Sequence, residues 1–193
     1  MSDQPSRRAR LQLVGLLLVF AAPVLAAYGY YYFGPTTAGR SYGELLAVGP
    51  LPDVSLPRDN EPPMAWSALR GKWLLVMVDG GDCPASCRDK LYRIRQIRLA
   101  LGKDQDRLDR VWLLSDGQPR PDDLPGEYAG TRIFRAQGSP LLSALPEPEG
   151  VSSRDEFWLV DPLGNLVLRY PREFDPKRVI KDLERLLKVS QIG

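Results

Sequence analysis

Residues 73–87 read WLLVMVDGGDCPASC. The first six residues of this stretch are all apolar, and such a run bounded by turn residues predicts a buried central strand. Residues 79–82, Asp-Gly-Gly-Asp, are typical of a turn. Pro84 suits the first turn of a helix. We therefore expect a strand, a tight turn and a helix, with both cysteines of the chain at the junction.

The flanking segments continue this pattern. The helix that starts near Pro84 has one apolar stripe and ends plausibly at Gly102. Residues 110–115 predict a second buried strand, and residues 131–134 a further small element. Further segments predict a short strand at 53–56, a hairpin formed by 157–161 and 166–170, and a last helix that begins with Asp175 as its N-cap and Pro176.

The order of these elements predicts the fold class. A strand, a helix and a parallel strand are followed by a hairpin and a helix, which is the order that a thioredoxin-like α/β fold requires. We place this domain at residues 50–193 and a linker at residues 34–49. The domain is long enough for one hydrophobic core.

An uncharged apolar segment, residues 11–33, precedes the domain. Because a membrane span needs about 20 apolar residues, this segment predicts one transmembrane helix. Its C-terminal end is rich in tyrosine, as expected of the membrane interface. A cleavable signal peptide is the alternative, with Val24-Leu25-Ala26 as a small-residue cleavage site. We prefer an uncleaved anchor because the apolar run continues to Phe33.

The charges on either side of this segment predict its direction. Arg7, Arg8 and Arg10 precede it, and only Arg40 follows it closely. By the positive-inside rule, residues 1–10 are then cytoplasmic and the domain is exported. In a bacterium this is a single-pass protein of the inner (cytoplasmic) membrane with its C-terminal domain in the periplasm, where disulfides persist.

The composition limits the possible functions. The chain of 193 residues has 26 Lys and Arg against 24 Asp and Glu, so we expect no nucleic-acid partner. It has no His, which excludes His-based acid–base catalysis and every His-containing metal site. Acidic residues in the loops suggest a hard-metal site, but loop carboxylates are usually solvated, and we interpret them so: Asp79, Asp82, Asp116, Asp122 and Asp123.

The two cysteines, Cys83 and Cys87, are the candidate site. The helix N-terminus lowers the pKa of a thiol, so we expect Cys83 to be the more exposed thiolate and Cys87, one helical turn further, its resolving partner. Their spacing permits either a disulfide or two-point coordination of a soft metal ion. A structural disulfide is the alternative, although a bridge that closes so short a loop stabilises little.

With these residues in view, the chain resembles the SCO/SenC family of cytochrome c oxidase assembly proteins. Four stretches carry the resemblance: Gly49–Val54, Leu69–Val76, Cys83–Cys87 and Trp158–Gly164. The resemblance implies a single-span, thioredoxin-like protein whose Cys-x3-Cys pair serves the copper-site subunit of a respiratory oxidase. It carries over Cys83 and Cys87 as catalytic residues and as ligands of Cu(I), with no cofactor required.

The chain departs from the family at the copper site. The family adds a His shortly before the last hairpin, and Ser153 or a neighbour occupies that place here. Two thiolates suffice for Cu(I), whereas Cu(II) prefers nitrogen ligands. A general thiol-disulfide oxidoreductase of the thioredoxin type would place a Pro facing the cysteines, and residues 151–153 contain none.

We therefore expect an assembly factor that acts as a thiol reductant or as a Cu(I) carrier. Two alternatives stay open. One is a non-catalytic membrane interaction protein whose cysteines form an inert bridge, and the other is a general thiol-disulfide oxidoreductase. The reduction potential of the cysteine pair distinguishes the inert bridge from a redox site.

Overall fold

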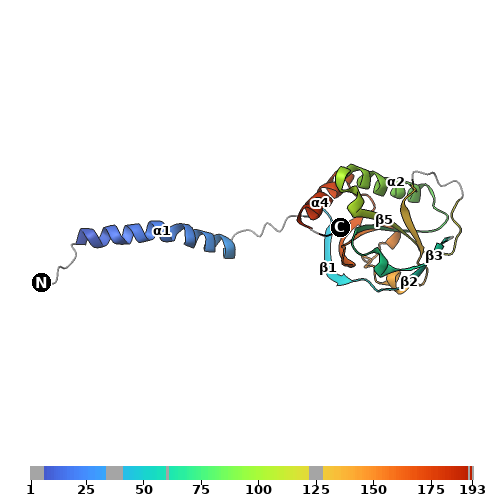
Figure 1. Ribbon diagram of the computed structural model, residues 1–193, viewed down its shortest axis with the longest axis horizontal. Helices are drawn as coiled ribbons and strands as arrows, with labels where there is room; N and C mark the ends of the chain where they lie inside the picture. Colours follow the sequence, from blue (N-terminus) through green and yellow to red (C-terminus); the bar gives the residue numbers. More distant parts are fainter. Residues whose placement is uncertain (1–6, 34–40, 60, 122–127, 191, 193) are drawn as a thin grey trace. The chain divides into compact units, whose positions relative to one another are not determined.

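A computed structural model describes residues 7–33, 41–59, 61–121, 128–190 and 192. The chain forms two compact units, Met1–Arg40 and Ser41–Gly193 (Figure 1). Each unit is described by itself below.

The first unit contains one long helix, α1 (Arg7–Phe33), with Pro23 inside it. Its segment Leu11–Tyr30 has a mean hydropathy of 2.1 and is long and apolar enough to cross a membrane. The large apolar side chains of this segment are exposed, which is unfavourable in water and favourable in lipid. The chain therefore has a candidate membrane anchor where the sequence predicts it.

The second unit is built on a six-stranded sheet in the order β1-β8-β7-β4-β5-β6. The central strand β4 (Trp73–Asp79) is parallel to β5 (Leu108–Leu114), and β5 is parallel to β6 (Thr131–Arg135). On the other side of β4 the strands are antiparallel: β7 (Glu156–Val160), β8 (Asn165–Pro171) and β1 (Glu44–Pro50). The predicted strands at 73–78, 110–115 and 131–134 and the hairpin are thus confirmed.

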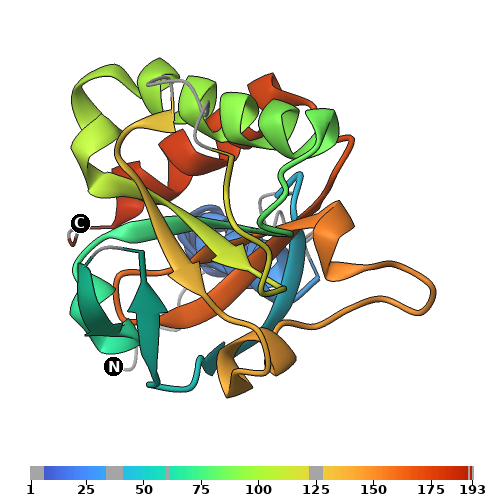
Figure 2. The same ribbon diagram turned by 90° about the vertical axis from the view of Figure 1, so that its right-hand side faces the viewer.

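Each face of the sheet is covered by a separate layer. The helices α2 (Ala85–Ala100) and α4 (Pro176–Val189) lie together on one face (Figure 2). The opposite face packs against smaller elements: η1 (Trp66–Leu69), α3 (Pro140–Ser143) and the hairpin of β2 (Ser55–Arg58) and β3 (Glu61–Ala65). Every residue of β4 is buried because it lies between these two layers, which explains its unbroken apolar run.

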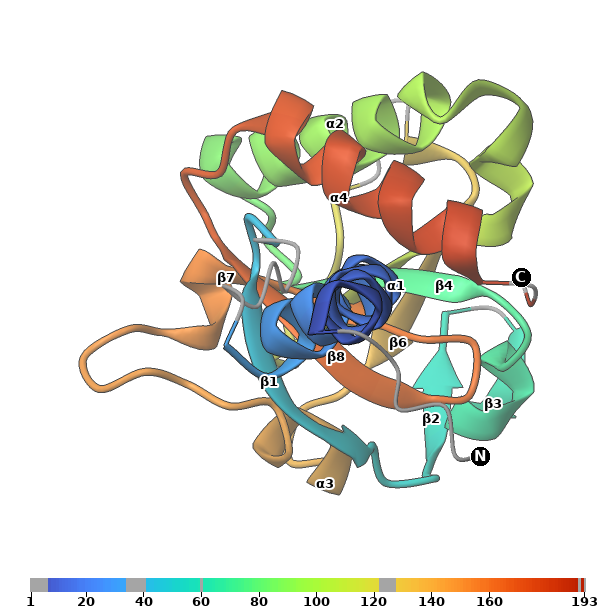
Figure 3. The ribbon, with the colours of Figure 1, turned by 90° about the vertical axis from the view of Figure 1, so that its left-hand side faces the viewer.

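The predicted linker, residues 34–49, is wrong at its C-terminal end. Glu44–Pro50 forms β1, which pairs with β8 at the edge of the sheet (Figure 3). Just before it, the Asp182 carboxylate on α4 accepts hydrogen bonds from the backbone N–H groups of Tyr42 (2.7 Å) and Gly43 (3.0 Å). These contacts tie the segment to the domain, so the compact unit begins at Ser41 rather than at Pro50.

The last helix begins as the sequence predicts. The Asp175 side chain caps α4 by accepting a hydrogen bond from the Lys177 N–H at 2.9 Å. The short strand predicted at 53–56 is displaced by two residues and pairs with β3, which the sequence analysis did not identify. Two further 3-10 segments, η2 (Gly102–Arg107) and η4 (Ser153–Asp155), complete the described elements.

Candidate functional site

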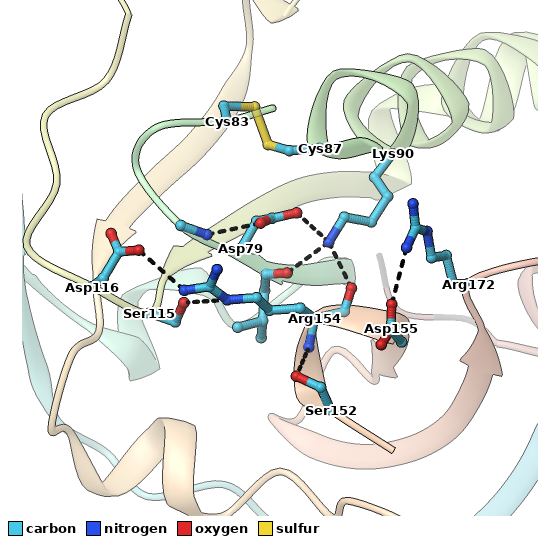
Figure 4. Close-up of polar contacts among 12 residues, drawn as sticks. Asp79, Cys83, Cys87, Lys90, Ser115, Asp116, Ser152, Arg154, Asp155 and Arg172 are labelled. Carbon is cyan, nitrogen blue, oxygen red and sulfur yellow. Dashed lines mark hydrogen bonds and ion pairs between the residues drawn. A yellow bond between two sulfur atoms is a disulfide. The ribbon is translucent and has the colours of Figure 1, made fainter. Parts of the chain in front are cut away.

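The two cysteines form a disulfide at the junction of β4 and α2. Their Cα atoms are 5.0 Å apart (Figure 4). Cys87 lies in the first turn of α2, and Cys83 lies just before the helix, whose N-cap is Pro84. The structure thus places both predicted site residues together, at the carboxyl end of the central strand.

Both cysteines are buried in this disulfide form. Cys83 is 1% exposed and Cys87 is 0% exposed, and the expectation that Cys83 is the more exposed thiolate, which concerns the reduced pair, stays a prediction. Both belong to the apolar cluster that α2 covers. Asp82, Pro84 and Ala85 are exposed beside them. Because both cysteines are buried, a partner reaches the sulfur atoms only when neighbouring residues move.

The backbone of Cys83 adopts a left-handed conformation with φ of 41°. It is the only non-glycine residue with positive φ in the described part of the chain. For an L-residue this region costs about 1–2 kcal/mol relative to the right-handed one. Strain of this kind persists only where the surroundings hold it, and it is concentrated at functional sites.

The two glycines before the cysteines allow the loop to pack closely against its neighbours. A Cβ atom at Gly81 would lie 2.0 Å from the carbonyl oxygen of Gln118. The Gly81 N–H donates a hydrogen bond of 2.8 Å to Oδ1 of Asp116. This backbone hydrogen bond is the main reason that the pKa of Asp116 lies below its usual value. The loop is therefore held to the segment that follows β5.

Arg154, in the segment before β7, binds the segment that follows β5. Its Nη2 donates to Oδ2 of Asp116 at 3.0 Å, and its Nε donates to Oγ of Ser115 at 3.2 Å. The resemblance to the SCO/SenC family places Ser153 or a neighbour where that family has its His, and here the backbone N–H of Ser153 donates to Oε1 of Glu147 at 3.1 Å. The cation of Arg154, rather than an imidazole, thus reaches toward the cysteine loop from this segment (Figure 4).

Lys90 and Asp79 form a buried ion pair close to the disulfide, with 2.5 Å between Nζ and Oδ2. Lys90 is 2% exposed and Asp79 is 4% exposed, so the prediction that Asp79 is solvated is wrong. Burial lowers the pKa of Lys90, and the hydrogen bond and charge of Asp79 oppose this shift. Lys90 was not predicted from the sequence, although its position three residues after Cys87 places it on the buried side of α2.

The acidic residues that the structure describes form no hard-metal site. Among the described residues, no group of three or more His, Cys, Asp or Glu side chains is arranged to hold a metal ion. Asp116 is hydrogen-bonded and ion-paired as above, Asp82 is exposed, and Asp122 and Asp123 lie outside the described residues. The donors that fit a soft ion are the two sulfur atoms, and only after reduction of the disulfide.

The comparisons with known proteins agree with this geometry. Residues 73–190 match the family described as "Transmembrane-like, thioredoxin-like, C-terminal domain". The chain belongs to this family. Its domain therefore has the thioredoxin-like α/β fold that the order of elements predicts. No curated protein sequence matches the chain significantly.

Similar solved structures include several Sco proteins. Apo Sco1 from Thermus thermophilus has a TM-score of 0.60 and 19% identity, over 78% of this chain and 99% of that one. Yeast Sco1 with copper bound has a TM-score of 0.57 and 20% identity, over 79% of this chain and 96% of that one. ScoI from Bradyrhizobium japonicum with copper bound has a TM-score of 0.53 and 19% identity, over 71% of this chain and 99% of that one. At these identities the likeness shows a shared fold. The resemblance to SCO/SenC proteins is therefore confirmed at the level of the fold.

Proposed function

We propose that this protein is a membrane-anchored assembly factor for a respiratory oxidase, and that it reduces the copper-site cysteines of a partner subunit. The observation that carries the proposal is the disulfide between Cys83 and Cys87 at the carboxyl end of the central strand. The likeness to Sco structures supports the kind of partner, since one of them is described as a disulfide switch in a cytochrome c oxidase assembly protein.

In the proposed reaction the reduced pair donates two electrons to a partner disulfide. The Cys83 thiolate attacks one partner sulfur, and the partner S–S bond breaks as a mixed disulfide forms. Cys87 then loses its proton and attacks Sγ of Cys83, which closes the bond seen here and releases the partner as a dithiol. The helix N-terminus and the strained backbone of Cys83 favour this residue as the attacking one.

A second candidate function is the carriage of Cu(I) as cargo. Two thiolates separated by one helical turn suit this soft ion, and several of the similar Sco structures contain copper. Reduction is favoured over carriage because the chain has no His to serve as a third copper ligand, and Arg154, in the segment where the SCO/SenC family places its His, is bonded to Asp116 and Ser115 instead.

We also propose that the anchor is retained and that the domain is periplasmic. Arg7 and Arg8 begin α1 on the side before the apolar segment, as the positive-inside rule requires of a cytoplasmic N-terminus. An oxidising compartment is consistent with a protein whose two cysteines are paired.

The reduction potential of the pair tests the proposal. The full-length protein in detergent is equilibrated with glutathione buffers, and its thiols are then alkylated and counted. A structural disulfide has a potential below about −300 mV, and we expect a clearly higher value here. A value below that limit contradicts the proposal and favours the inert bridge. If the protein were a general oxidoreductase, it would reduce disulfides of unrelated proteins as fast as it reduces the disulfide of the copper-site subunit.

A further inference from the structure

The ammonium group of Lys90 has three buried acceptors. It contacts Oδ2 of Asp79 at 2.5 Å, and it donates to the carbonyl oxygens of Val78 and Arg154 at 2.8 Å each. Three donors are what a protonated lysine provides. Lys90 therefore joins α2, the end of β4 and the segment that carries Arg154 (Figure 4).

A buried ion pair of this kind is not explained by stability. The free-energy cost of removing two charges from water is often as large as the gain from their attraction. A protein with apolar residues of similar volume in their place is often equally stable. The remainder of this cluster is apolar, with Leu91 and Ile94 following on the same helix. The placement of a full charge of each sign beside the cysteines therefore points to an electrostatic role.

Lys90 lies on the same buried side of α2 as Cys87, three residues away, so their side chains are neighbours. Asp79 lies at the end of β4, before the loop that leads to Cys83. The other charges close to this pair are themselves paired: Asp155 with Arg172 at 3.2 Å, and Asp116 with Arg154 at 3.0 Å. Arg88 also reaches the cysteines, because its Nε donates to the carbonyl oxygen of Cys83 at 3.4 Å, but this side chain is partly exposed. Lys90 and Asp79 are the buried charges on α2 and β4, the two elements that the cysteine loop joins.

We propose that Lys90 and Asp79 are positioning residues that set the redox equilibrium of Cys83 and Cys87, with Lys90 favouring the reduced form and Asp79 opposing it. This inference rests on the proposed function, because it concerns the reaction of the same disulfide. In that equilibrium a donor dithiol gives two electrons, the S–S bond of this protein breaks, and an S–S bond forms in the donor. The negative charge that remains on a released sulfur is attracted by Lys90 and repelled by Asp79.

The test is the redox equilibrium of full-length variants with glutathione. Lys90→Met should shift the equilibrium constant about tenfold toward the disulfide, which is about 30 mV for this two-electron couple. Asp79→Asn should shift it toward the dithiol, and the double variant should lie close to the unmodified protein. Lys90→Arg, which keeps the charge, should restore the equilibrium to within about twofold of the original.

Two matched variants control for a merely structural effect. Arg110→Met removes another buried cation, in β5, and Asp182→Asn removes another buried carboxylate, on α4. Neither residue lies on β4 or α2, the elements that the cysteine loop joins. Both should lower stability and leave the redox equilibrium unchanged. If Lys90→Met does not fold, the opposite shift of Asp79→Asn and the rescue by Lys90→Arg carry the test.

The inference is overturned if Lys90→Met gives no shift toward the disulfide, or if Asp79→Asn shifts the equilibrium in that same direction. These outcomes are independent of the proposed function. A potential of the unmodified protein below about −300 mV contradicts the redox function, whereas the signs of the variant shifts test the role of the two charges at any starting value.

Discussion

The substitution Gly81→Ala should destabilise the domain and disturb the cysteine loop. A new Cβ would lie 2.0 Å from the carbonyl oxygen of Gln118 and 2.7 Å from its carbonyl carbon. Carbon and carbonyl oxygen atoms approach to about 3.3 Å, so the two segments must separate by about 1.3 Å. Because both atoms belong to the backbone of Gln118, no side-chain rotation relieves the clash.

The size of the effect follows from two contributions. Overpacking in a well-packed region costs about 1–3 kcal/mol. Separation of the segments also breaks the hydrogen bond from Gly81 to the Asp116 carboxylate, and such charged hydrogen bonds contribute about 1.5–3 kcal/mol. Together they give a loss of about 2.5–6 kcal/mol, which lowers the unfolding temperature of a domain of this size by at least about 5 °C.

The assay is thermal unfolding of the oxidised full-length protein, followed by near-ultraviolet circular dichroism of its buried tryptophans. Gly49→Ala is the matched control, since its new Cβ would meet nothing closer than the Ala47 carbonyl oxygen at 3.9 Å. That variant should unfold within about 2 °C of the unmodified protein. If Gly81→Ala unfolds as late as Gly49→Ala, the close packing of the loop against Gln118 is refuted.

Three further predictions concern pH, copper and topology. Because the pKa of Asp116 is lower in the folded protein than its ordinary value of 3.8, this carboxylate stabilises the fold fully above pH 3.8. The stabilisation is lost as the pH falls through the pKa of the folded state. Asp116→Asn should abolish this part of the acid sensitivity when unfolding is measured over a series of pH values. The reduced protein, titrated anaerobically, should bind Cu(I) at Cys83 and Cys87 and give no lasting Cu(II)–thiolate signal in electron paramagnetic resonance, and a stoichiometric signal would reveal a replacement for the missing His. A reporter active only in the periplasm should be active when fused to the C-terminus, whereas a mature protein that begins near Ala27 and washes off membranes would contradict the retained anchor.

The parts of the fold that the sequence predicts are those with strong local signals. The apolar run of β4 reflects burial on both faces, and the turn after it is set by glycine and aspartate. The hairpin is predicted because Asp161 begins its turn. Oδ1 of Asp161 accepts hydrogen bonds from the backbone N–H groups of Leu163 at 2.9 Å and Asn165 at 2.8 Å. α4 is predicted because Asp175 caps its first turn.

The elements that were missed depend on distant contacts. β1 is an edge strand whose side chains are mostly exposed, so it has no clear alternation, and its partner β8 lies far along the chain. β3 contains two prolines, which usually argue against a strand and are tolerated only at an edge. Neither segment carries a local pattern that distinguishes it from a loop.

The two cysteines of the site were predicted from the sequence, whereas the buried charges beside them were not. The position of Cys83 and Cys87 follows from the strand, turn and helix around them. The burial of Lys90 depends on Asp79, Val78 and the Arg154 carbonyl, which reach it from other elements. A lysine that follows a charged helical segment is ordinarily solvated, and only the assembled fold shows the three acceptors that hold it.

One measurement tests the central proposal most directly. The fully reduced full-length protein is mixed with an oxidase copper-site subunit whose two cysteines are joined as a disulfide, and the thiols of both proteins are counted by mass spectrometry after alkylation. We expect a stoichiometric exchange, in which Cys83 and Cys87 become a disulfide as the subunit gains two thiols. If the subunit stays oxidised while a small dithiol reduces it readily under the same conditions, the proposed function is contradicted.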